Sequence, residues 1–175
     1  MLFLSELETG REVVALGPRL DPDARAVARV ADPVLDEVLD DDAQHAPPQR
    51  ELERGIDVDS KLELPLRRRM LRVIVENLVE NAIRYAGDGV RVQVGARRRD
   101  GQIVLRVADD GAGVAAEDLP RLFERFFRAD RARASRGTGL GLAIVKHVVG
   151  AAGGSVEARG GLGRGLEIRC AFPAA

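Results

Sequence analysis

The sequence predicts an α+β fold in which helices pack on one face of a β-sheet. The first observation is a long segment over 66–86, whose apolar residues recur at the three- and four-residue spacing of a helix. The second is a pair of segments, 90–94 and 103–107, in which apolar and polar residues alternate and which Asp100 and Gly101 join as in a β-hairpin. Because helices and hairpins alternate irregularly along the chain, we expect a two-layer sandwich.

The remaining elements follow from the same periodicities. A short helical pattern at 2–8 ends at Gly10, and an amphipathic run over 23–42 contains Pro33, which indicates either a kink or a second helix start. The other expected elements are a strand at 56–58 extending towards Leu64, a helix at 116–127, an arginine-rich loop at 128–138, a helix at 140–151, and strands at 155–158 and 166–172.

Length and composition are typical of one intracellular domain. The chain has 175 residues, of which 45% are hydrophobic, and this is enough to form a full core. The formal net charge of −1 gives no general electrostatic reason to bind nucleic acid or an anionic membrane. No apolar run approaches the roughly 18–20 residues that span a bilayer, no signal peptide is visible, and Cys170 is the only cysteine. We therefore expect a soluble protein in a reducing compartment.

Three glycines, at positions 137, 139 and 141, directly precede an apolar helical segment. The run lacks the spacing of a Walker loop, and Leu142 stands where a dinucleotide-binding fingerprint would need its third glycine. Glycines can direct backbone N–H groups at an anion beside a helix N-terminus. Taken alone, the run is equally consistent with phosphate binding and with a plain loop-to-helix turn.

Two asparagines, Asn77 and Asn81, lie one turn apart on the otherwise apolar face of the 66–86 helix. An amide oxygen is a neutral hard ligand that suits Mg²⁺, which keeps water and phosphate oxygens in its other positions. Arg84 and Tyr85 follow at the helix end, and an arginine there can bind phosphate through two parallel hydrogen bonds. A hydrogen bond within a helix interface would explain one asparagine, but the pair favours a metal and phosphate site.

The acidic segment Asp109-Asp110-Gly111-Ala112-Gly113 follows the 103–107 strand, so Asp109 is expected to be partly buried at a strand end. A buried carboxylate requires hydrogen-bond donors, and an adenine amino group is a suitable one. The alternative is a simple acidic turn. Farther on, three of the five phenylalanines fall within 122–128, which predicts an aromatic core cluster that could also anchor a lid.

The order of these four motifs resembles that of the catalytic ATP-binding domain of bacterial two-component sensor histidine kinases, with the PhoR-like branch the most similar. That domain has the Bergerat fold, shared with gyrase B and MutL-type ATPases, and the resemblance covers residues 22–173. It implies a mixed sheet packed on about three helices. The implied boundaries are a stub of a dimerisation helix plus linker at 1–10, a catalytic domain at 11–175, an N box at 73–86, a first glycine box at 109–113, a Phe box at 122–128, a lid at 128–138 and a second glycine box at 137–142.

The resemblance also implies ATP and Mg²⁺ as cofactors and a role for each motif residue. Asn81 would bind Mg²⁺ with the support of Asn77, and Arg84, which stands where a lysine is common, would meet phosphate; these are the expected catalytic residues. Tyr85 would lie beside the nucleotide, and Asp109 would accept a hydrogen bond from the adenine amino group. The other expected nucleotide contacts are Gly111, Gly113, Arg128, Gly137, Thr138, Gly139, Leu140, Gly141 and Leu142. The later segment 163–166 lacks the threonine often found there, so no role is assigned to it.

Three activities stay open on these grounds. A protein-histidine kinase is favoured, because Asn77 occupies the position at which the related ATPases place a water-activating glutamate. Glu76 and Glu80 are expected to point about 100° to either side of the face that Asn77 and Asn81 share. The alternatives are a non-catalytic nucleotide-binding regulator and a Bergerat-fold ATPase or anti-sigma-type serine kinase.

Neither His45 nor His147 has the neighbours of a phosphoacceptor motif. The chain is therefore expected to bind Mg-ATP without phosphorylating itself, and the implied acceptor is a histidine on a dimerisation domain outside this chain. A response regulator is the implied indirect partner, and no nucleic-acid partner is expected. We expect a monomeric fragment, a homodimeric and membrane-anchored full-length protein, and a cytoplasmic location for this portion.

Overall fold

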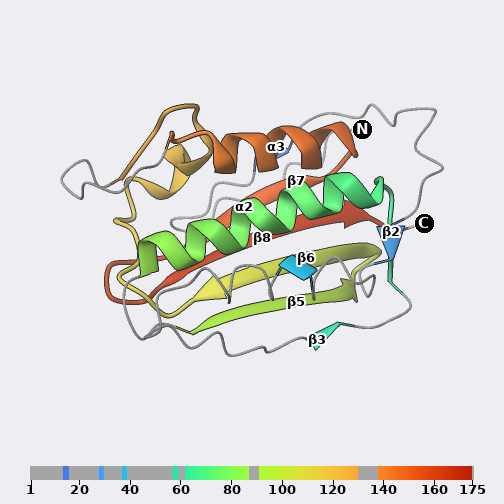
Figure 1. The fold of residues 1–175 in the computed structure, drawn as a ribbon, viewed down its shortest axis with the longest axis horizontal. Coiled ribbons are helices and arrows are strands. Elements are labelled where there is room, and N and C mark those ends of the chain that lie inside the picture. Colours follow the sequence, from blue (N-terminus) through green and yellow to red (C-terminus); the bar gives the residue numbers. More distant parts are fainter. Residues whose placement is uncertain are drawn as a thin grey trace.

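The computed structural model describes residues 14–15, 28–29, 37–38, 57–58, 62–86, 91–129 and 138–174. The helical pattern expected at 2–8, most of the run at 23–42, His45 and the middle of the expected lid lie outside the described residues. Within these ranges, a six-stranded sheet is covered on one face by two α-helices (Figure 1). The α+β sandwich predicted from the sequence is confirmed.

The main sheet is mixed, as expected, because one edge strand pairs in parallel and the other neighbours pair antiparallel. Its strands, in spatial order, are β1 (Val14–Ala15), β7 (Ser155–Gly160), β8 (Leu166–Pro173), β6 (Gln102–Asp109), β5 (Val92–Arg99) and the parallel edge β3 (Asp57–Val58). The strand expected at 56–58 thus corresponds to β3. Leu64 does not continue it, because β4 (Glu63–Leu64) pairs with β2 (Ala28–Arg29) in a separate two-stranded sheet.

The long helix α2 (Arg68–Ala86) lies across the sheet with one apolar stripe facing the core. Its buried residues follow helical spacing and are Leu71, Ile74, Val75, Leu78, Val79 and Ala82. Val73, Asn77 and Asn81 are only partly buried. We predicted that both asparagines lie on the apolar face of this helix, but the structure places them beside the buried stripe. The correction removes the anomaly of two amides in an apolar interface, because both asparagines lie beside the buried stripe.

Strands β5 and β6 form the predicted hairpin, paired in continuous register from Val92 opposite Asp109 to Arg99 opposite Gln102. The buried residues of the two strands lie on one face and are Val92, Val94, Ala96, Ile103, Leu105 and Val107. The hairpin thereby fixes Asp109, the last residue of β6, at the edge of the sheet where α2 ends (Figure 1).

The helix expected at 116–127 is wrong in length. The structure has only a 3₁₀ helix, η1 (Leu119–Phe123), with a proline in its first turn. Glu124 then adopts an extended conformation, and the backbone N–H of Phe126 donates to the carbonyl of Gly139 at 2.8 Å. The chain leaves the helix because this long-range hydrogen bond replaces the local one. Phe123 is buried, whereas Phe126 is 71% exposed, so the Phe box is only in part a core cluster.

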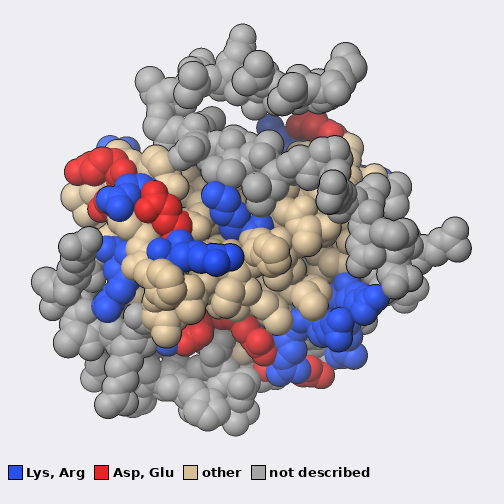
Figure 2. Space-filling view, turned by 90° about the horizontal axis from the view of Figure 1, so that it is seen from above, with Lys and Arg blue, Asp and Glu red and all other residues tan. Residues whose placement is uncertain are grey.

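The last helix, α3 (Gly141–Ala151), lies beside α2 in the helix layer (Figure 1). It buries Leu142, Val145 and Val149 in the common core. Figure 2 views the molecule from above Figure 1, where uncharged surface occupies much of the middle of the face and both basic and acidic side chains lie around it. None of the helices within the described ranges is both long and apolar enough to cross a membrane.

On the sheet face away from the helices, Glu167 of β8 forms ion pairs with Arg106 of β6 and Arg169 of its own strand. Burial by itself would raise the pKa of Glu167, but the hydrogen bonds from both guanidinium groups outweigh it and hold the pKa below its ordinary value. These pairs lie on the strand surface that α2 and α3 do not cover.

Candidate functional site

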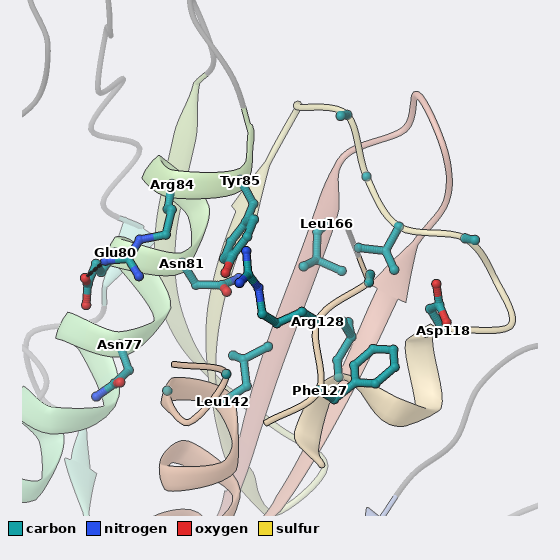
Figure 3. Close-up of a pocket in the computed structure, with 18 of the residues that line it drawn as sticks. Asn77, Glu80, Asn81, Arg84, Tyr85, Asp118, Phe127, Arg128, Leu142 and Leu166 are labelled. Atoms are coloured by element: carbon teal, nitrogen blue, oxygen red, sulfur yellow. Dashed lines mark hydrogen bonds and ion pairs between the residues drawn. The ribbon is translucent and has the colours of Figure 1, made fainter. Parts of the chain in front are cut away.

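A cavity of about 570 Å³ opens between the C-terminal half of α2, the loop after β6, the segment after η1 and the N-terminus of α3 (Figure 3). Its lining residues are Asn77, Glu80, Asn81, Arg84, Tyr85, Ala112, Gly113, Val114, Ala115, Asp118, Leu122, Phe127, Arg128, Ala129, Thr138, Gly139, Gly141, Leu142, Leu162 and Leu166. Residues far apart in the sequence therefore share one space.

Helix α2 supplies the polar side of the cavity. Asn77, Asn81, Arg84 and Tyr85 all reach it, because their three- and four-residue spacing keeps them on one stripe of the helix. Arg84 forms an ion pair with Glu80, shown by the dashed line in Figure 3. Glu80 thus also lines the cavity, although the sequence placed it beside the site and not in it.

The N-terminus of α3 meets α2 at Asn77. The Nδ2 of Asn77 donates a 2.7 Å hydrogen bond to the carbonyl of Val73, one turn earlier in its own helix. Its Oδ1 is directed at Gly141, where an added Cβ would lie 2.8 Å from that oxygen. A side chain at position 141 would therefore displace the Asn77 amide, and the glycine allows the first turn of α3 to pack closely against α2 at the edge of the cavity.

Arg128 reaches into the cavity from the segment after η1. Figure 3 shows its side chain extending towards Asn81 and Tyr85 on α2. A guanidinium group in this position contributes positive charge and several donors at the polar end of the cavity. This geometry is what binding of an anionic group such as phosphate requires.

Asp109 lies at the end of β6 beneath the apolar end of the cavity. Its Oδ1 accepts a 3.0 Å hydrogen bond from the backbone N–H of Gly111, and the N–H of Leu166 is a second donor. Burial raises the pKa of Asp109 above its ordinary value, these two hydrogen bonds oppose the rise, and the neighbouring charge of Asp110 adds to it. Burial thus disfavours the ionised form of Asp109, and two backbone donors partly stabilise it.

The loop at 109–113 packs backbone to backbone against the turn between β7 and β8, residues 161–165. Gly163 N–H donates to Ala112 carbonyl at 2.8 Å, and Gly165 N–H donates to Gly111 carbonyl at 3.0 Å. The approach leaves no room for side chains. A Cβ at Gly113 would lie 1.9 Å from the oxygen of Gly161, and a Cβ at Gly165 would lie 2.0 Å from that of Asp109.

A family model described as "Histidine kinase-, DNA gyrase B-, and HSP90-like ATPase" matches residues 67–175, which include this entire cavity. The chain belongs to this ATPase family. The Bergerat fold expected from the order of the motifs is thereby confirmed, and with it the assignment to an ATP-binding domain.

Similar proteins and solved structures place the domain within the family. Sensor-like histidine kinase SenX3 of Mycolicibacterium smegmatis is 45% identical over 106 residues, which make up 59% of this chain and 28% of that protein. The structure of mycobacterial sensor histidine kinase MprB superimposes with a TM-score of 0.72 at 29% identity, covering 81% of this chain and 93% of that one. Full-length ShkA in complex with AMPPNP gives 0.70 at 33% identity, covering 85% and 31%. The chain is the catalytic ATP-binding domain of a sensor histidine kinase and spans less than a third of SenX3.

The histidine-kinase domain brings most of the residues predicted from the sequence into one cavity. Those that line it are Asn77, Asn81, Arg84, Tyr85, Gly113, Arg128, Thr138, Gly139, Gly141 and Leu142. Asp109, Gly111 and Leu140 are described but do not line it, and Gly137 lies outside the described residues. Asp109 and Gly111 form the layer directly below, in contact with Gly165 and the lining residue Leu166.

The sequence missed the contribution of the β7–β8 turn. Its segment 163–166 received no role because it lacks a threonine, yet Leu162 and Leu166 line the cavity and Gly165 bonds to the loop at 109–113. The glycine spacing could have indicated that this turn contributes to the site. Glycines recur at every second position, 161, 163 and 165, as they do in the earlier run at 137–141.

We expect Gly139→Ala to be more destabilising than Gly163→Ala. Both glycines have positive φ, +68° and +69°, so alanine pays roughly 1–2 kcal/mol of backbone strain at either position. Only at Gly139 would the Cβ also approach backbone atoms, those of Phe126 and Phe127 at 2.8–2.9 Å, whereas nothing lies within 4 Å at Gly163. Urea unfolding of both variants measures the difference, and equal losses would show that the contact between Gly139 and Phe126 is not tightly packed.

We expect Asp109→Asn to change how the stability of the free domain depends on pH. The pKa of Asp109 is raised in the folded state above the ordinary value of 3.8. The folded state therefore retains this proton longer than the unfolded chain, and stability is lost as pH rises through the folded-state pKa. Because asparagine cannot ionise, the variant should be at least as stable as the wild type at neutral pH, and the gap should close towards about pH 4.

Urea unfolding measured across that pH range tests this expectation. Asp100→Asn in the exposed hairpin turn is the control and should leave the pH profile of the unfolding free energy unchanged. A wild-type advantage at neutral pH that disappears in acid would contradict the raised pKa of Asp109.

Proposed function

We propose that this domain binds Mg-ATP in the cavity and transfers the γ-phosphate to a histidine on a dimerisation domain outside the chain. The observation that carries the proposal is the meeting of Asn81, Tyr85 and Arg128 in one part of a cavity whose lining away from α2 is largely apolar, with Asp118 as its one carboxylate. A triphosphate and its cation suit the first part, and a purine suits the apolar lining.

The residues present fit a magnesium ion that is bound mainly through nucleotide phosphates. Among the described residues no cluster of three or more His, Cys, Asp or Glu is placed to hold a metal. An amide oxygen from Asn81, with Asn77 one turn away, is the partial ligand set that Mg²⁺ accepts when water and phosphate oxygens complete its shell. The ion would screen the charge of the triphosphate.

The chain's own residues would then act by positioning and charge neutralisation. Arg128 and Thr138 are placed to donate to phosphate oxygens, and Arg84 is placed to join them if it exchanges its ion pair with Glu80 for one with phosphate. Asp109 would accept the hydrogen bond of an adenine amino group from below the base. Gly111, Gly137 and Leu140 are proposed to shape the pocket and the lid.

Transfer to an external nucleophile is favoured over hydrolysis. Asn77 stands in the position where a water-activating carboxylate would be needed, and an amide cannot accept a proton at neutral pH. The two nearby glutamates are held by arginines, Glu76 by Arg72 at 2.7 Å and Glu80 by Arg84. His147 is exposed on α3. We therefore propose that the phosphoacceptor histidine comes from outside this chain.

The full-length protein is proposed to be a homodimeric, membrane-anchored sensor whose cognate partner is a response regulator. The support is similarity to SenX3, PmrB of Pseudomonas aeruginosa and SrrB of Staphylococcus aureus, whose names describe sensors. In such an arrangement this domain would lie in the cytoplasm.

We expect Asn81→Ala to remove the Mg²⁺ dependence of ATP binding while leaving the fold intact. Asn81 lies beside the buried stripe of α2 and not in it, and alanine has the highest helix propensity, so little stability should be lost. Calorimetric titration with ATP, with and without Mg²⁺, measures the effect. Gln102→Ala, an exposed amide on β6, is the control. Persistence of the full Mg²⁺ effect in Asn81→Ala would place the metal elsewhere.

We expect phosphate to appear on a separately produced dimerisation hairpin when the domain and Mg-ATP are added. The bond formed to a histidine nitrogen should be labile in acid and stable in base, which distinguishes it from a serine or threonine phosphate. The hairpin with its acceptor histidine replaced is the control. Release of inorganic phosphate at the same rate without the hairpin would instead favour an ATPase.

A further inference from the structure

We propose that Leu162, in the β7–β8 turn, packs on the nucleotide base and sets the affinity of the domain for the adenosine part of ATP. This inference rests on the proposed function, because it assumes that the cavity takes ATP. It adds an affinity-determining residue that lies in neither the N box, the Phe box nor the two glycine boxes.

Leu162 is unusual because it is exposed and yet borders the cavity. Among the described residues, the large hydrophobic side chains that are exposed are Phe126 at 71%, Ile144 at 41% and Leu162 at 72%. Of these three, only Leu162 lines the cavity. Leaving a leucine open to water forgoes burial that would stabilise the free domain, and a ligand in the cavity could recover it.

The backbone holds Leu162 in place before any ligand arrives. The turn is tied to the loop at 109–113 by the hydrogen bonds of Gly163 and Gly165, and Arg164 N–H donates to Gly161 carbonyl at 2.9 Å within the turn. Gly113 and Gly161 approach too closely for a side chain to separate them. A backbone fixed in this manner needs little further ordering on binding.

The surroundings of Leu162 identify the part of the nucleotide that it would touch. Leu166 also lines the cavity, and its backbone N–H donates to Asp109. Ala112 and Gly113 contact the turn that carries Leu162 and have no charge, whereas Asn81 and Arg84 line the α2 side. Asp118 is the one carboxylate among the lining residues outside α2. An apolar surface beside the Asp109 carboxylate fits the faces and amino edge of adenine. Leu162 is therefore expected to contact base and ribose, and not phosphate.

The test compares affinities for AMP, ADP and ATP in wild type and Leu162→Ala by competition against a fluorescent ADP analogue. Removing part of a leucine contact should weaken all three nucleotides by a similar factor, about threefold to tenfold. Arg128→Ala should behave differently, because the loss of affinity that it causes should increase from AMP to ADP to ATP. Ile144→Ala removes an apolar side chain that is also exposed but does not line the cavity, and it should leave all three affinities unchanged. Leu162→Met should restore most of the affinity.

The outcomes separate the two proposals. If the wild-type domain binds none of the three nucleotides, the proposed function itself is wrong. If the wild type binds them and Leu162→Ala binds equally well, or weakens only the polyphosphates, the role of Leu162 is overturned while the nucleotide site stands. Because Leu162 is mostly exposed, its replacement should not unfold the domain, and a thermal unfolding curve matching the wild type checks this.

Discussion

The site depends on close approaches between backbone segments that no side chain could enter. Each joins two parts of the chain that are distant in sequence, and each requires a glycine at the contact. The three contacts are Gly113 with Gly161, Gly165 with Asp109, and Gly139 with Phe126 and Phe127. Gly141 of α3 adds a close contact with the Asn77 side chain. Together they bring the loop after β6, the β7–β8 turn, the segment after η1 and the start of α3 around one cavity. The glycines are therefore as much packing residues as ligand-binding ones.

This construction divides the cavity into two chemically different ends. The part lined by α2 has amides and a guanidinium group, whereas the part near the sheet has leucines above the half-buried Asp109 carboxylate, and Asp118 also lines the cavity. Burial of Asp109 costs stability in the free domain, and exposure of Leu162 forgoes some. Both costs lie at the base end, where a bound purine could offset them by donating one hydrogen bond and covering one apolar side chain. Function and stability are thus opposed at the same few residues.

The fold was largely predictable because its elements have strong local signals. The amphipathic period of α2, the Asp100-Gly101 turn and the alternation in β5 and β6 each fix an element independently of the rest. The failures occurred where a distant contact overrode a local pattern. The helix expected at 116–127 shrinks to η1 because Phe126 bonds to Gly139, and Leu64 joins a second sheet instead of extending β3.

The sequence by itself determined which kinds of side chain and backbone the site contains, because the amides, the acidic turn and the glycine runs each form a short local motif. It also determined the polar stripe of α2, since three- and four-residue spacing is a property of one helix. Only the tertiary structure decided that Asp109 lies beneath the cavity and that Leu162 borders it. These placements come from contacts between segments more than fifty residues apart, such as Asp109 with Leu166, and no local periodicity encodes such distances.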